Sequence, residues 1–207
     1  SVPLSVQIPE YEISNKSGFF ENVILRNQTV KNPILSLEDL ALFNDKKILV
    51  LCGQGPEDSR LKKALVGFNR NSNVIILNEN TSGVNDQSFI NCIDRILNGI
   101  DEKNEKRYTP DMIITIGGAI VSKRIKAFFI KNKPKKHFAI KHSVIGTDLF
   151  LRIDKHIKTE ASLFFEMLNK KTTLLNSKNY KGIWQQLDTT IKDKIPIFFK
   201  DPSKQSD

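Results

Sequence analysis

The sequence has few of the residues that build metal centres, disulfide frameworks or membrane spans. Its 207 residues include only two cysteines and three histidines. Cys52 and Cys92 lie far apart and form no C-x-x-C pair, so neither a zinc site nor a disulfide framework is indicated. No apolar run approaches the roughly 18 residues that a membrane helix needs, and the first residues lack the charged-then-apolar order of a signal peptide. We therefore expect a protein without a membrane span, in a reducing cytoplasm.

The sequence also lacks an evident catalytic set of side chains. His137, His142 and His156 cannot be combined into a Ser-His-Asp or Cys-His arrangement, and we expect them to be surface or connector residues. The net charge of +9 would suit a polyanionic partner or small acidic substrates. Most of the 13 phenylalanines, however, fall on periodic apolar faces rather than among the basic runs, where a nucleic-acid stacking platform would need them. We expect no nucleic-acid partner, and we interpret the basic run at 131–136 as a solvated connection.

What the sequence does have is a strand, a glycine turn and a helix in direct succession over residues 110–130. The run Met112–Ile116 is rich in β-branched residues, which is typical of a strand buried on both faces of a parallel sheet. Gly117 and Gly118 then predict a tight turn, which lets a ligand approach the backbone closely. The apolar residues that follow at helical spacing are Val121, Ile125, Phe128 and Phe129.

The start of this predicted helix is a candidate binding site. Free N–H groups at a helix N-terminus favour an anion. Lys123 and Arg124 fall in the opening turns, and the donor fork of an arginine fits a carboxylate or a phosphate through two hydrogen bonds. We take Gly117, Gly118 and Ser122 as the turn that supports the site. The alternative is a purely structural turn, because the same pattern occurs in α/β proteins that bind nothing there.

The rest of the chain also alternates strands with helices. Apolar runs predict strands at residues 47–52, 74–77, 137–141 and 149–153. Helical spacing predicts a short helix capped by Ser36, and longer helices at residues 57–68, 88–97, 159–168 and 180–192. Residues 101–106 are expected to form a solvated loop. This order predicts a three-layer, doubly wound α/β domain with a mainly parallel, Rossmann-like sheet of about five strands.

A second glycine turn, Gly53-Gln54-Gly55, follows the first predicted strand. Ligands of doubly wound sheets bind beyond the carboxyl ends of the strands, where both glycine turns are expected. A dinucleotide fingerprint would need a third glycine at the position of Asp58 and an acidic residue for the ribose, and both are missing. A stand-alone nucleotide-binding module is therefore only the alternative interpretation.

Composition also predicts how the chain is divided. Residues 1–20 contain two prolines and little periodicity, which is typical of an extended connector from a preceding domain. Residues 21–175 are predicted to form the Rossmann-like central domain. Residues 176–207 are predicted to form a C-terminal helix and a connector to a following domain. We therefore expect the chain to be a piece of a longer polypeptide.

The stretch PDMIITIGGAIVSKRIKAFF, residues 110–129, resembles the central domain of the MenD family, the thiamine-diphosphate-dependent synthases of menaquinone biosynthesis. In that family a strand that opens on Pro-Asp runs into a glycine turn and a Ser-Lys or Gly-Lys pair, often followed by Arg. The opening SVPLSVQIPEYE, residues 1–12, resembles the segment that leads from the first domain of the family to the second. The resemblance extends over most of the chain in order and spacing, and these two stretches are its specific parts.

The resemblance implies a function for the parent protein. Such a synthase joins decarboxylated 2-oxoglutarate to isochorismate on thiamine diphosphate and magnesium, and the full-length enzyme is expected to be a homo-oligomer. This chain lacks the Gly-Asp-Gly magnesium motif, so the resemblance places the cofactor on catalytic domains that precede and follow it in the same polypeptide. It implies that the chain alone is inactive and supplies no catalytic, cofactor or metal-binding residue. It also implies that Arg124 binds a substrate carboxylate, while Lys123 adds positive potential.

Overall fold

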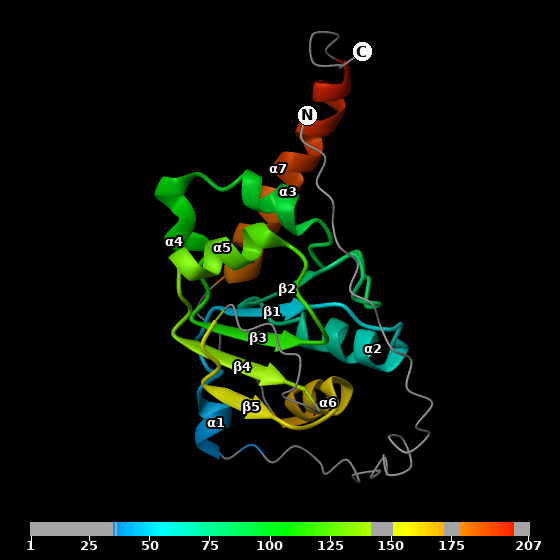
Figure 1. The fold of residues 1–207 in the computed structure, drawn as a ribbon, viewed down its shortest axis with the longest axis vertical. Coiled ribbons are helices and arrows are strands. Elements are labelled where there is room, and N and C mark those ends of the chain that lie inside the picture. Colours follow the sequence, from blue (N-terminus) through cyan, green and yellow to red (C-terminus); the bar gives the residue numbers. More distant parts are fainter. Residues whose placement is uncertain (1–34, 36, 142–150, 172–178, 201–207) are drawn as a thin grey trace, which may run out of the picture.

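The structure is a computed structural model, and it describes residue 35 and residues 37–141, 151–171 and 179–200 (Figure 1). Five parallel strands form one sheet in the order β2-β1-β3-β4-β5. The strands are β1 Ile48–Cys52, β2 Val74–Asn78, β3 Met112–Ile116, β4 Lys136–Ile140 and β5 Lys155–Ile157. The helices are α1 Leu37–Ala41, α2 Ser59–Phe68, α3 Ile93–Asn98, the 3-10 turn η1 Glu102–Asn104, α4 Glu105–Tyr108, α5 Lys123–Lys131, α6 Ala161–Lys171 and α7 Tyr180–Lys200.

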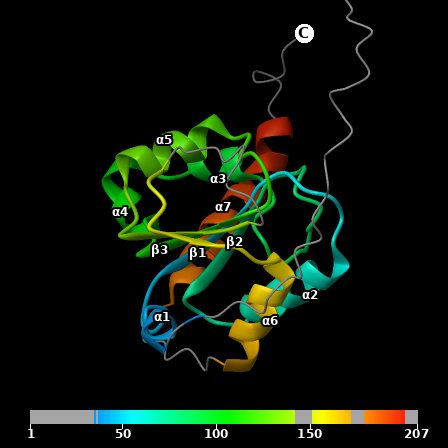
Figure 2. The ribbon, with the colours of Figure 1, turned by 60° about the horizontal axis from the view of Figure 1, so that its bottom comes forward.

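Helices cover both faces of the sheet, which confirms the predicted doubly wound α/β fold. Helices α2 and α6 pack on one face, and α3, α5 and α7 pack on the other (Figure 2). Successive strand residues point to opposite faces, so Val50 joins the core under α2 and α6 while Leu49 and Leu51 join the core under α5 and α7. Every residue of β1, β2 and β3 is therefore buried, which explains the continuous apolar runs.

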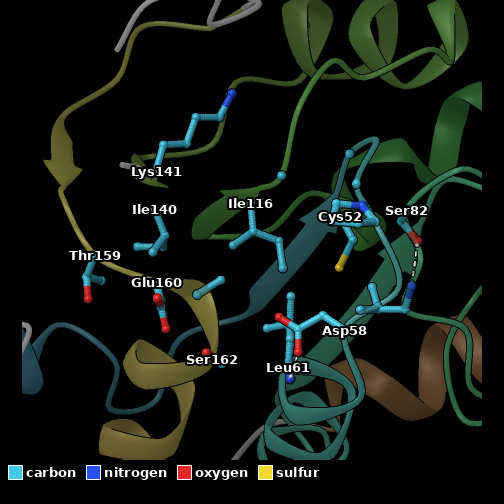
Figure 3. Close-up of a pocket in the computed structure, with 16 residues that line it drawn as sticks. Cys52, Asp58, Leu61, Ser82, Ile116, Ile140, Lys141, Thr159, Glu160 and Ser162 are labelled. Carbon is cyan, nitrogen blue, oxygen red and sulfur yellow. Dashed lines mark hydrogen bonds between the residues drawn. The ribbon is translucent and has the colours of Figure 1, made fainter. Parts of the chain in front are cut away.

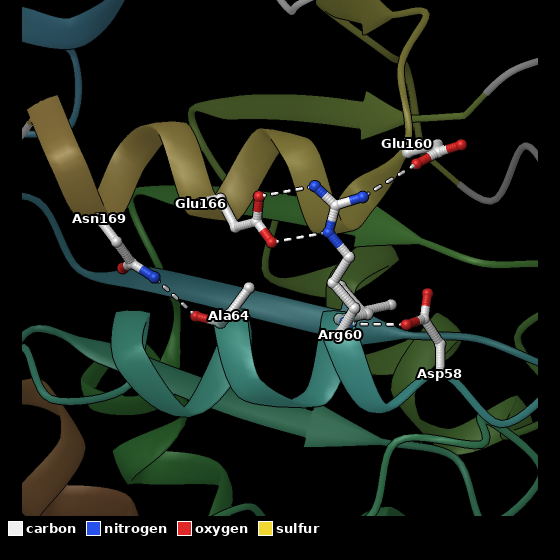
Figure 4. Close-up of polar contacts among 7 residues, drawn as sticks. Asp58, Arg60, Ala64, Glu160, Glu166 and Asn169 are labelled. Atoms are coloured by element: carbon white, nitrogen blue, oxygen red, sulfur yellow. Dashed lines mark hydrogen bonds and ion pairs between the residues drawn. The ribbon is translucent and has the colours of Figure 1, made fainter. Parts of the chain in front are cut away.

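Hydrogen bonds and ion pairs connect α2 with α6 along their outer sides (Figure 4). The guanidinium of Arg60 donates to both carboxylate oxygens of Glu166, at 2.8 and 2.9 Å, and lies 4.0 Å from Glu160. One turn further on, the amide of Asn169 donates to the backbone carbonyl of Ala64 at 2.9 Å. The hydrogen bonds from Arg60 hold the pKa of Glu166 below its usual value. These contacts hold α2 and α6 in place relative to each other.

The predicted helix at 88–97 is wrong in its first half. Ile90 is extended and forms a bridge beside β2, where its N–H donates to the carbonyl of Ile76 at 2.9 Å. Helix α3 begins only at Ile93. Phe89 and Ile93 consequently point to opposite faces of the sheet, although their spacing had predicted one common face.

Other boundaries also differ from the prediction. Val121 does not belong to the apolar stripe, because it precedes α5 and is 61% exposed, while Ile120 is buried in its place. The expected loop at 101–106 contains η1 and the start of α4, since Asp101 caps the first turn and Glu105 binds Lys131. Helix α7 extends to residue 200, beyond the predicted end at 192.

The last strand lies later in the chain than expected. Residues 151–153 of the predicted strand at 149–153 are not in the sheet, and β5 instead begins at Lys155. The carboxylate of Asp154 accepts the N–H of His137 at 2.8 Å and the N–H of Asp154 donates to the carbonyl of His137, so the pairing of β4 with β5 starts one residue further on.

The expectation that the histidines lie at the surface is wrong for His137. This residue is in β4, is only 5% exposed, and its Nε2 lies 2.9 Å from the hydroxyl of Thr115. Burial lowers the pKa of His137. His156 is half-buried in β5. The predictions for Ser36, His142, the connector at 1–20 and the terminal residues after 200 lie outside the described residues.

Candidate functional site

The two glycine turns lie against each other at the carboxyl edge of the sheet. The N–H of Gly53 donates to the carbonyl of Ile116 at 2.9 Å, and the N–H of Gly118 donates to the carbonyl of Gln54 at 2.6 Å. A Cβ atom at Gly53 would lie 2.5 Å from the carbonyl oxygen of Gly118, and Gly117 has the left-handed φ of 76°. The glycines are therefore needed for the close packing of one turn on the other.

A cavity of about 360 Å³ opens at the ends of β1, β3 and β4, beside the starts of α2 and α6 (Figure 3). We call it the switch-point cavity, because the chain leaves β1 toward β2 on one side and β3 toward β4 on the other, and doubly wound proteins bind ligands at such a point. Its apolar lining includes Leu61, Ile116 and Ile140. The polar residues of its lining include Asp58, Ser82, Lys141, Thr159, Glu160 and Ser162.

The N-terminus of α2 beside this cavity is closed by the protein itself. Asp58 is the N-cap, and its carboxylate accepts the N–H of Leu61 at 2.8 Å. The pyrophosphate of a dinucleotide would require these N–H groups and would meet a negative charge instead. The N–H of Gly55 is likewise used, because it donates to the carbonyl of Thr81 at 3.0 Å. The structure thus gives a physical reason to disfavour a dinucleotide here.

A second cavity, of about 580 Å³, lies on the other face of the sheet, between the start of α5 and helix α3. We call it the α5 cavity. It is lined mostly by polar and charged side chains, among them Glu79, Asp94, Arg95, Ser122, Lys123 and Arg124. The structure therefore brings Ser122, Lys123 and Arg124 together in this cavity, whereas Gly117 lines the switch-point cavity.

The two N–H groups that come just before α5, those of Val121 and Ser122, are bound within the protein. Both N–H groups donate to one carboxylate oxygen of Glu79, at 3.0 and 2.9 Å. The hydroxyl of Ser122 caps the helix by accepting the N–H of Ile125 at 3.1 Å, and it donates to the carboxylate of Asp94. A carboxylate of the protein therefore lies just before the helix, beside the place that the sequence had suggested for an external anion.

The side chain of Arg124 is exposed, as is that of Lys123. The guanidinium of Arg124 donates through Nη1 to the amide oxygen of Asn98, the last residue of α3. Sequence reasoning missed the three residues that hold this region, namely Glu79, Asp94 and Asn98. Glu79 follows β2, whereas Asp94 and Asn98 are in α3, and no local pattern marks any of these common polar residues.

The side chains of the described residues are not arranged to bind magnesium together with a diphosphate group. No group of three His, Cys, Asp or Glu side chains is placed to hold a metal ion within the described ranges. The two carboxylates of the switch-point cavity already have partners, because Asp58 caps α2 and Glu160 lies beside Arg60. In the same ranges, no helix is long and apolar enough to cross a bilayer.

The fold and the site define a Rossmann-like α/β domain with a charged cavity at the carboxyl edge of its sheet. Comparison with known proteins narrows this class. The chain is 34% identical over 176 residues to the 2-succinyl-5-enolpyruvyl-6-hydroxy-3-cyclohexene-1-carboxylate synthase of Flavobacterium johnsoniae, a match that covers 84% of the chain and 30% of that protein. Proteins with the same name are 37% identical over 150 residues in Flavobacterium psychrophilum and 27% identical over 139 residues in Desulfotalea psychrophila.

These two matches cover 70% and 67% of the chain, and 27% and 26% of the respective relatives. The chain belongs to this synthase family, and it spans less than a third of the length of these curated relatives. No family model matches the chain.

Proposed function

We propose that the chain is the central domain of a synthase that joins decarboxylated 2-oxoglutarate to isochorismate with thiamine diphosphate. The observation that supports this proposal is the similarity to synthases of that name along most of the chain, over less than a third of their length. In this proposal residues 21–175 are the Rossmann-like domain, and residues 1–20 and 176–207 connect it to the preceding and following catalytic domains. The complete enzyme is a cytoplasmic homo-oligomer.

The proposed contribution of this domain is a substrate contact from the α5 cavity. Both substrates carry two carboxylates, and the exposed guanidinium of Arg124 can present two N–H donors to one of them. Lys123, exposed beside it, adds positive potential. Gly117, Gly118 and Ser122 form the turn that sets the start of α5.

Thiamine diphosphate supplies the carbanion chemistry of the complete enzyme, and in our proposal other domains hold it together with magnesium. The placement of the cofactor on other domains is supported by the carboxylates near the sheet edge, because they already accept hydrogen bonds from the protein itself. The same contacts count against a stand-alone nucleotide-binding module, although the position of the switch-point cavity would suit one.

An assay of this chain beside the complete synthase that contains it tests the proposal. With isochorismate, 2-oxoglutarate, thiamine diphosphate and magnesium, we expect product from the complete synthase and none from this chain. Turnover by the chain alone that depends on the added cofactor would contradict the role of a non-catalytic domain. A folded complete synthase that does not consume either substrate would contradict the family function.

A further inference from the structure

The turn between β3 and α5 has few side chains that could fix it by packing. Gly117, Gly118 and Ala119 are exposed, and Val121 is 61% exposed. Only Ile120, at 3%, and Ser122, at 7%, are buried. The position of the turn, and of the helix start that follows it, must therefore depend largely on hydrogen bonds.

Glu79 provides two of these hydrogen bonds from a distant part of the sheet. It follows β2, which is separated from β3 by β1, and its own N–H donates to the carbonyl of Cys52 at 3.0 Å. Its backbone is thus fixed at the end of β1. Its side chain reaches the far turn, where Oε1 accepts the N–H groups of Val121 and Ser122 at 3.0 and 2.9 Å. A single carboxylate oxygen therefore links the end of β2 to the start of α5.

The residues held by Glu79 lead directly to Arg124. Ser122 is the N-cap of α5, so its backbone sets where the helix begins. Arg124 is the second residue of that helix, and the direction of its side chain follows from the first turn. Asn98 contacts the guanidinium itself, whereas Glu79 contacts only the backbone before the helix.

We propose that Glu79 is a positioning residue, which orients Arg124 toward a substrate carboxylate by holding the first turn of α5. This inference rests on the proposed function, since the carboxylate contact of Arg124 is what Glu79 would position. Glu79 acts through geometry, because its oxygen accepts two N–H groups of the backbone. A glutamine at this position keeps one such oxygen, and an alanine keeps none.

The test measures steady-state kinetics of the complete synthase with each substrate varied in turn. We expect Glu79→Ala to raise KM for one dicarboxylate substrate about five- to tenfold and to change kcat by less than about twofold, as expected for lost binding without lost chemistry. Glu79→Gln should stay within about twofold of the wild type. In an Arg124→Ala background, Glu79→Ala should add less than about twofold, because a residue that acts through Arg124 has nothing left to position. An equal loss in the glutamine variant, or effects that multiply, would overturn the proposal.

Hydrogen exchange on this chain separates the proposal from the proposed function. In Glu79→Ala the amides of Val121 and Ser122 should exchange at least about tenfold faster than in the wild type, since both have lost their acceptor. Glu79→Gln should remain protected, and so should the control Glu57→Ala, which removes an exposed carboxylate from the turn after β1. Unchanged exchange in Glu79→Ala would overturn the positioning role. A third outcome is faster exchange in Glu79→Ala together with unaltered kinetics of Arg124→Ala. Glu79 would then still hold the turn, but it would not position a substrate contact. The Arg124 contact in the proposed function would fail as well.

Discussion

The switch-point cavity and the α5 cavity lie at the same edge of one sheet, yet they open on opposite faces of it and differ in how apolar their linings are. The first is bounded by the ends of β1, β3 and β4 and has Leu61, Ile116 and Ile140 in its lining. The second is lined by both signs of charge, with Glu79 and Asp94 close to Lys123 and Arg124. The general rule for doubly wound folds selects the first cavity, and the family motif selects the second. Fold class therefore points to this edge of the sheet, and the family motif is the basis for our proposal that the α5 cavity is the part that binds substrate.

The contact between the two glycine turns underlies both cavities, because both turns line the switch-point cavity and the second leads into α5. Gly53→Ala would place a Cβ 2.5 Å from the carbonyl oxygen of Gly118, and neither backbone can move freely. We expect a loss of about 2–3 kcal/mol in the free energy of unfolding, as for other overpacked sites. Gly55→Ala is the matched control, because its Cβ would lie 3.3 Å from the carbonyl oxygen of Ser82, and it should cost less than about 1 kcal/mol. Urea unfolding of the chain measures both values, and equal losses would refute the dependence on this contact.

Removing the N-cap residue beside each cavity should cost a similar amount of stability, so the effects of the two substitutions on kinetics can be compared. Asp58→Ala removes the cap of α2 beside the switch-point cavity, and Ser122→Ala removes the cap of α5 beside the other. Each should lower the free energy of unfolding by about 1 kcal/mol. In the complete synthase, only Ser122→Ala should raise a substrate KM, by about two- to fivefold, because it alone disturbs the start of the Arg124 helix. An equal KM change in Asp58→Ala would show that the switch-point cavity also serves the reaction.

The smallest expected effect concerns nucleotides at the switch-point cavity. Calorimetry of the chain with NAD, FAD and ATP should show no binding tighter than about millimolar, since the Asp58 carboxylate and the Thr81 carbonyl already accept the N–H groups of Leu61 and Gly55. Micromolar affinity for any of the three nucleotides would contradict this expectation. If that affinity were lost when the switch-point cavity is altered, the switch-point cavity and not the α5 cavity would be the first candidate for the functional site.

Local sequence patterns predicted the first four strands and the glycine turns well, but not the position of β5. The runs at β1 and β3 are continuously apolar because both faces of these strands are covered, and this property is visible in the sequence itself. The spacing of Phe89 and Ile93 misled the prediction, because Ile90 pairs with the edge of β2 and only the tertiary structure shows that pairing. Long-range pairing overrides local periodicity in such places.

The candidate site was predictable only where it is local. Ser122, Lys123 and Arg124 are neighbours in the sequence, and the glycine turn before them predicts that a helix begins there. Glu79 and Asn98 were not predictable, because they reach this helix from the end of β2 and the end of α3. A carboxylate in a polar loop carries no sign of which backbone it will bind.

The comparison between the cavities is tested most directly by steady-state kinetics of Arg124 variants in the complete synthase. Arg124→Ala should remove a charge-assisted interaction of roughly 1.5–3 kcal/mol, which corresponds to about ten- to hundredfold in kcat/KM for one substrate. Arg124→Lys should recover part of the loss, because an ammonium retains the charge but not the planar fork.

Thr159→Val is the matched control, since it removes a buried hydroxyl from the switch-point cavity with little change in volume, and kcat/KM should stay within about twofold. We expect a selective loss of kcat/KM in the Arg124 variants. Unchanged constants for both substrates in Arg124→Ala, at an unaltered melting temperature, would contradict it and leave the domain as a scaffold.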